Sequence, residues 1–117
     1  MSALREKVKR LEQYVATDEG AADPVVEQAV DKLLQRETAR LTELKTRLEQ
    51  QLGEFGKQYA MKTPDFYARF ERGELGDAAD FVEWSATFEM VENLKKRLAL
   101  LQVWRKARSF STRKRNA

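Results

Sequence analysis

The chain has 117 residues, of which 35% are charged and 42% hydrophobic, and its formal net charge is +3. This length suits one small domain, and the low number of turn formers (5 Gly and 2 Pro) favours long helices. Because the sequence contains no cysteine or histidine, disulfides, Ser-His-Asp and Cys-His catalytic centres and imidazole metal sites are excluded.

The sequence also bears on location and chemistry. No run of about 18 apolar residues occurs, so no transmembrane helix is expected. The N-terminal stretch MSALREKVKR is charged and lacks the apolar segment of a signal peptide, which leads us to expect a cytoplasmic protein. No nucleophile–base pair or cofactor motif appears, so we expect no enzymatic activity, no cofactor and no metal ion.

A short helix is predicted near the N-terminus, from Leu4 to Val15. Leu4, Val8, Leu11 and Val15 are separated by three or four residues, which places them on one helix face. Residues 16–23, ATDEGAAD, break this pattern and are predicted to form a loop.

A long helix is predicted from Pro24 to near Ala60. Asp23 can cap its first turn, and proline suits the first helical position. Apolar residues then recur in a nearly regular heptad pattern, which predicts coiled-coil-like packing against another helix. The seam consists of Val30, Leu34, Leu41, Leu44, Leu48, Leu52, Phe55 and Tyr59.

A short aromatic helix is predicted next. Thr63 is the expected N-cap and Pro64 the first helical residue, while Gly73 is expected to end the helix in a left-handed conformation. Its aromatic face contains Phe66, Tyr67 and Phe70.

The last predicted helix begins after Asp77, which is expected to cap it. A second apolar stripe follows at spacings of three and four, and should face the first stripe. The predicted fold class is therefore all-α: a long antiparallel helical hairpin, coiled-coil-like, with the short aromatic helix at its turn and a small N-terminal helix. The stripe consists of Phe81, Trp84, Phe88, Val91, Leu94, Leu98 and Leu101.

A basic tail closes the sequence. Residues 105–117 contain six cations and no acid, so the preceding 104 residues carry 3 − 6 = −3. We predict a single helical domain over residues 1–104, helicity that fades between Arg105 and Phe110, and a disordered tail over 105–117. Phosphate neutralisation by the tail could bind nucleic acid. The cations are Arg105, Lys106, Arg108, Arg113, Lys114 and Arg115.

Two side-chain groups between the last two helices could form a site. The acids Glu74, Asp77, Asp80 and Glu83 are better explained by a helix start, where negative charge is favourable, than by a metal or active site. The aromatic residues Phe81, Trp84 and Phe88 could form the core at the hairpin's closed end or anchor a partner protein. Trp104 could either pack on the first long helix or lie exposed for contact.

The region between residues 66 and 84 also carries a distinctive motif. It resembles a motif of small bacterial and archaeal proteins that form the antitoxin half of two-gene toxin–antitoxin modules, and the resemblance covers roughly residues 25–101. The resemblance implies a non-enzymatic protein that neutralises a cognate toxin by direct binding. The motif reads Phe66-Tyr67-x-x-Phe70-x-x-Gly73-Glu74-Leu75-Gly76-Asp77-x-x-Asp80-Phe81-x-Glu83-Trp84.

Partner-binding residues are accordingly expected in and near this motif. The alternative function is a self-associating helical scaffold, and in either case we expect a homodimer. The apolar surface of the long helix is wider than a single helix-packing seam, so a second hairpin could cover it in a four-helix bundle. This surface includes Val30, Leu33, Leu34 and Leu44. The candidate partner-binding residues are Glu74, Asp77, Phe81, Trp84 and Trp104.

Overall fold

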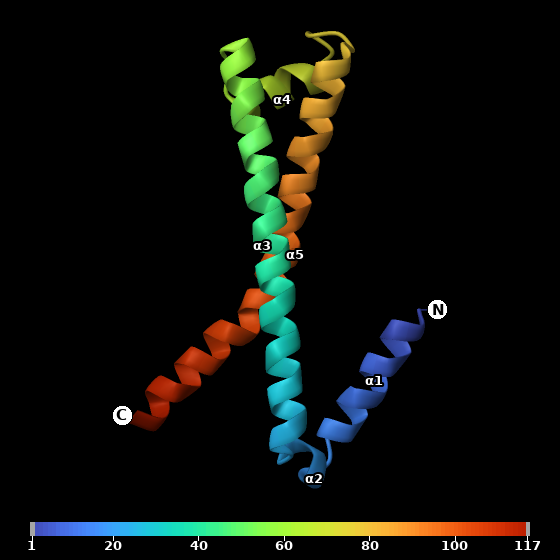
Figure 1. Cartoon of the computed structure of the whole chain (residues 1–117), viewed down its shortest axis with the longest axis vertical. Helices are drawn as coiled ribbons and strands as arrows, with labels where there is room; N and C mark the ends of the chain where they lie inside the picture. The colour runs from blue at the N-terminus through green and yellow to red at the C-terminus, as the bar shows by residue number, and fades with distance from the viewer. Residues whose placement is uncertain (1, 117) are drawn as a thin grey trace. The chain divides into compact units, whose positions relative to one another are not determined.

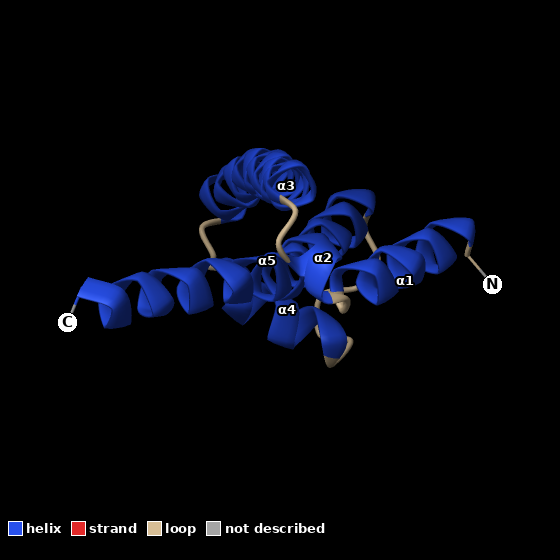
Figure 2. Ribbon diagram, turned by 90° about the horizontal axis from the view of Figure 1, so that it is seen from below, coloured by secondary structure: helices blue, strands red, loops and turns tan. Residues whose placement is uncertain are grey.

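The computed structural model describes the backbone of residues 2–116 and the side chains of residues 2–102. Within the described backbone there are only helices and their connections, with no strand (Figures 1 and 2). The predicted all-α class is confirmed. The helices are α1 (Ala3–Val15), α2 (Asp18–Ala21), α3 (Pro24–Tyr59), α4 (Thr63–Glu71) and α5 (Ala79–Asn116).

Contacts between residues divide the chain into two compact units. We call Met1–Arg36 the N-terminal unit and Glu37–Ala117 the C-terminal unit. Helix α3 contributes its first turns to the former and its remainder to the latter. Of the helices searched in the described part of the chain, none is long and apolar enough to cross a bilayer.

The N-terminal unit contains α1, α2 and the start of α3. Helix α1 agrees with the predicted helix, and its N-cap is Ser2, whose hydroxyl accepts a hydrogen bond from the Arg5 amide. The Asp23 carboxylate accepts a hydrogen bond of 2.9 Å from the Val25 amide, which confirms the predicted cap of α3. The loop predicted over residues 16–23 is wrong in part, because it contains α2. That helical turn forms because the Thr17 hydroxyl accepts a hydrogen bond from the Gly20 amide at 3.0 Å.

In the C-terminal unit, α3 and α5 pack together through an aliphatic cluster. Leu41 and Leu48 from α3 are buried against Val91, Leu94 and Leu98 from α5, and Leu41 and Val91 are each only 2% exposed. All five belong to the two apolar stripes of the sequence, so burial of these stripes supplies the main aliphatic contact between the helices.

Two expected helix caps differ from the structure. Helix α4 begins at Thr63, its N-cap is Lys62, and no side chain caps it. Thr63 is instead an interhelical acceptor, since the Trp84 indole N–H donates to its hydroxyl. Helix α5 begins at Ala79, and the Ala78 carbonyl accepts the Val82 amide, so the N-cap is Ala78 and the predicted Asp77 cap is wrong.

The helical backbone of α5 continues to Asn116, past the fading expected between Arg105 and Phe110. No glycine or proline interrupts residues 79–116, so nothing in the local sequence stops the helix. The proposed boundary between residues 104 and 105 stays a prediction, and the tail side chains lie outside the described residues.

Candidate functional site

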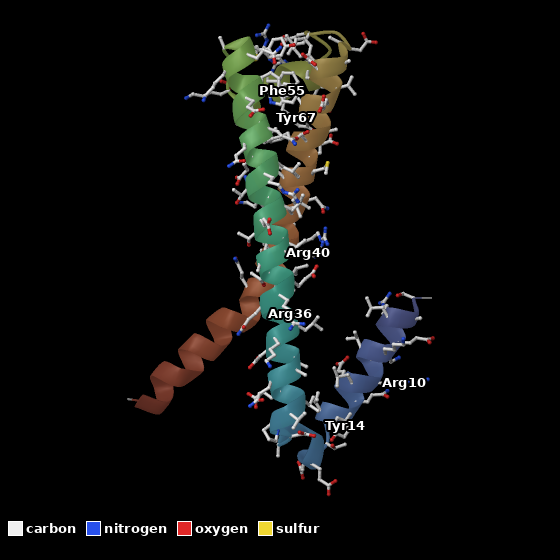
Figure 3. The ribbon with its side chains drawn as sticks, viewed as in Figure 1. Arg10, Tyr14, Arg36, Arg40, Phe55 and Tyr67 are labelled. Atoms are coloured by element: carbon white, nitrogen blue, oxygen red, sulfur yellow. The ribbon has the colours of Figure 1, made fainter. Side chains whose placement is uncertain are left out.

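An aromatic cluster lies where α4 meets α3 and α5 in the C-terminal unit. Figure 3 labels two of the rings at this end, Phe55 from α3 and Tyr67 from α4. At its centre are Trp84 and Phe66, each 0% exposed. The rings that contact one another at centroid distances up to 5.9 Å are Phe55, Tyr59, Phe66, Phe70, Phe81 and Trp84. Tyr67 packs separately against Phe88, with centroids 4.6 Å apart and ring planes inclined by 44°.

Four hydrogen bonds tie α5 to its neighbours around this cluster, one of them from the Gln58 side-chain amide to the Asp80 carboxylate at 3.5 Å. The Trp84 indole N–H donates to the Thr63 hydroxyl at 3.1 Å, and the Tyr59 hydroxyl donates to the Asp80 carboxylate. The Tyr67 hydroxyl donates to the Glu89 carboxylate at 2.7 Å. This last hydrogen bond stabilises the protonated phenol, so it raises the pKa of Tyr67 to about 12. The start of α5 is therefore held by specific hydrogen bonds as well as by ring packing.

The α4–α5 loop, residues 72–78, begins with a regular helix-ending motif. The Gly73 amide bonds to the Phe70 carbonyl at 3.0 Å, and the Glu74 amide bonds to the Arg69 carbonyl at 3.1 Å. These two hydrogen bonds, with Gly73 at φ +74°, form a Schellman motif. Gly76 also has positive φ, at +75°, a conformation that other residues rarely adopt. The glycines of the motif thus determine the path of the loop.

Glu74 is held in this loop by two arginines. Its carboxylate accepts a hydrogen bond from the Arg72 guanidinium at 3.0 Å and lies 3.5 Å from Nε of Arg69. The hydrogen bond from Arg72 lowers the pKa of the Glu74 carboxyl below its usual value. The side chain remains 46% exposed, so the carboxylate is accessible to solvent while it is paired with the two arginines.

The residues expected to bind a partner fall into four groups. Glu74 and Asp77 are exposed in the α4–α5 loop, and Phe81 is half-buried at the edge of the aromatic cluster. Trp84 is completely buried, so its surface is available to Phe66 and Tyr59 and not to a partner. The side chain of Trp104 lies outside the described residues, as do those of the six tail cations.

Sequence reasoning missed the residues that position Glu74. Arg69 and Arg72 lie on the last turn of α4 and at its C-cap, three residues apart and therefore on neighbouring positions of the helix surface. The order Arg-x-x-Arg-Gly-Glu in the sequence carries this information, because a glycine at C′ folds the following residue back toward the last helical turn.

The described residues include no group of three or more His, Cys, Asp or Glu side chains that could hold a metal ion. No protein-family model matches the chain, and neither a curated protein nor a solved structure matches it.

Proposed function

We propose that the protein is a non-enzymatic, antitoxin-like binding module that neutralises a cognate toxin protein by direct contact. The contact surface in this proposal is the α4–α5 loop, with Glu74 as its central residue. The platform is a long antiparallel hairpin of α3 and α5, with α4 as the aromatic helix at its turn. The aliphatic and aromatic clusters of the C-terminal unit support this arrangement.

The observation that carries the proposal is the fixed, exposed carboxylate of Glu74. A side chain that is already ordered by two arginines loses little conformational freedom when a partner binds, so more of its interaction energy appears as affinity. A hydrogen-bond-donating surface on the partner would match this carboxylate and the exposed Asp77, since Arg69 and Arg72 already balance the charge of these two acids.

Trp84 has a supporting role in this proposal. It packs between rings from α3 and α4 and so holds the α4–α5 loop at the start of α5. Phe81, at the rim, contributes its exposed edge to the contact surface. Binding by the module then depends on Trp84 through folding and on Glu74 through direct contact.

The test is co-expression with the protein encoded by the adjacent gene, followed by affinity purification. Glu74→Arg should abolish co-purification and leave the melting temperature nearly unchanged, because the side chain is half-exposed. Glu54→Arg is the matched control, since Glu54 is also an exposed glutamate but belongs to α3 and not to the loop. Undiminished co-purification of the Glu74→Arg variant would contradict the assignment of the contact surface, and absence of any complex with the unchanged protein would contradict the function.

A further inference from the structure

Helix α1 has an apolar face that its own unit leaves uncovered. No residue of this 13-residue helix is buried, and Leu4, Val8 and Leu11 are 70%, 54% and 38% exposed. Helices of this length are marginal in water without tertiary packing. A stable α1 therefore requires another apolar surface that packs against this face.

The same face forms one wall of an open groove of about 500 Å³ within the N-terminal unit. The other wall is the start of α3, and the two helices diverge from α2 in Figure 1. The apolar part of the lining consists of Val8, Leu11 and Val15 from α1, Ala21 from α2, and Val26 and Val30 from α3. An apolar groove between two helices is a common binding site for the apolar face of a third helix.

Close packing at α2 sets the direction of α1. A Cβ atom on Gly20 would lie 2.1 Å from the Tyr14 carbonyl oxygen, so only glycine permits this approach of α2 to the end of α1. The Thr17 hydroxyl donates to the same carbonyl at 2.7 Å, and the Tyr14 hydroxyl donates to Asp23 at 3.3 Å. The groove is thus a consequence of specific contacts.

Charge distinguishes the groove from helix α1 as a whole. The charged residues that line the groove are all acidic: Glu12, Asp23, Glu27 and Asp31. Helix α1 contains four basic and two acidic residues, whereas residues 16–31 contain five acidic and no basic residues. At 100° per residue, Arg5 and Lys7 flank the apolar stripe of α1 on opposite sides. None of the salt bridges among the side chains of residues 2–102 involves α1. An acidic groove is therefore complementary to the basic residues that flank the apolar stripe of α1 in a second copy.

We propose that the occupant of this groove is helix α1 of a second copy of the chain. In a two-fold arrangement, each α1 lies in the partner's groove, which covers both apolar faces and places Arg5 and Lys7 of each copy against the acidic lining of the other copy's groove. This pairing is independent of toxin binding, because it uses only the N-terminal unit.

Sedimentation equilibrium of the full-length protein tests the apolar contact. Val8→Glu should weaken self-association at least tenfold. Val25→Glu is the matched control, because Val25 is 73% exposed in the same unit and does not line the groove. Equal self-association of both variants, or a monomeric unchanged protein, would overturn the proposal.

A mixing experiment tests the charge pairing without changing any apolar residue. Arg5→Glu/Lys7→Glu and Glu27→Lys should each weaken self-association, whereas an equimolar mixture should form heterodimers in which both interfaces again pair opposite charges. A mixture that stays as weak as its components would overturn the proposal.

The basic tail is an alternative occupant of the groove. The triple variant Arg113→Gln/Lys114→Gln/Arg115→Gln of the full chain distinguishes the tail from α1. If this variant becomes monomeric while Val8→Glu does not, the tail and not α1 fills the groove, and the proposal is wrong. Unchanged self-association of the tail variant supports it.

Discussion

The Trp84 indole lies flat on the Phe66 ring, with centroids 3.8 Å apart and planes inclined by only 4°. Both side chains are completely buried, and the indole N–H still reaches an acceptor in the Thr63 hydroxyl. One residue of α5 is therefore fixed to α4 by stacking and by a hydrogen bond at once. This pair is the centre of the C-terminal unit's aromatic cluster.

Trp84→Ala should destabilise the protein by about 3–5 kcal/mol, because it removes a large buried ring and leaves a cavity. Toxin binding should then fall only in proportion to the unfolded fraction. Chemical denaturation gives the free energy of unfolding, and co-purification below the melting temperature gives the binding. A stable Trp84→Ala protein that no longer binds would show that the indole itself is a contact residue.

Thr63→Val should cost about 1–3 kcal/mol, because it leaves the buried indole N–H of Trp84 without its acceptor. Thr63→Ser keeps the hydroxyl and should lose much less stability. Urea denaturation of the two variants separates the loss of the hydrogen bond from the loss of a methyl group. Equal destabilisation by valine and serine would contradict the role of the hydroxyl.

Gly20→Ala and Gly53→Ala should have opposite effects. The first places a Cβ against the Tyr14 carbonyl and should destabilise the N-terminal unit by about 1–3 kcal/mol. The second meets nothing within 4 Å inside α3 and should stabilise the protein by about 0.5–1 kcal/mol. Thermal melts followed by far-UV circular dichroism measure both. Stabilisation by Gly20→Ala would mean that α1 and α2 do not pack closely.

Tyr67 should contribute to stability in a pH-dependent way. Its pKa is raised from an ordinary value of 10.0 to about 12, because its hydroxyl donates to Glu89. The folded state thus holds this proton more tightly than the unfolded state, so the contribution is complete below about pH 10 and disappears as the pH rises toward 12. Tyr67→Phe should remove this part of the alkaline stability loss, and Tyr14→Phe is the control. Identical pH profiles for the unchanged protein and Tyr67→Phe would contradict the assignment.

The basic tail should give salt-sensitive, sequence-independent nucleic-acid binding. Its six cations predict a log–log salt slope of several units if they contact phosphates. Replacing Arg113, Lys114 and Arg115 with glutamine should reduce both affinity and slope in a fluorescence-anisotropy titration. An unchanged slope would place any binding on another surface.

Local sequence pattern predicted the parts of the fold that depend on local physics. The apolar spacing and the Asp23-Pro24 start signal predicted α1 and α3 with nearly correct bounds, because capping and amphipathic periodicity act over a few residues. Helix α2 was missed because a single turn of helix has no periodicity, and it depends on the Thr17 cap and on the space that Gly20 leaves.

Side-chain partners distant in the sequence could not be predicted in this way. The sequence around Thr63 is typical of an N-cap, yet its hydroxyl accepts a hydrogen bond from the indole N–H of Trp84, 21 residues away. Glu74 was identified as a candidate contact, but its ordering by Arg69 and Arg72 follows from the three-dimensional course of the loop. The partner-binding roles of Glu74, Asp77 and Phe81 stay predictions until a complex is measured.

The concentration of rings at one end of the chain has an optical consequence. Every aromatic residue except Tyr14 lies at or after Phe55, so near-ultraviolet circular dichroism reports almost entirely on the C-terminal unit. Far-ultraviolet signals, in contrast, arise from helices in both units. If the two units melt separately, the two spectral regions will give different midpoints from one sample, so the protein carries its own internal probe of how cooperatively it unfolds.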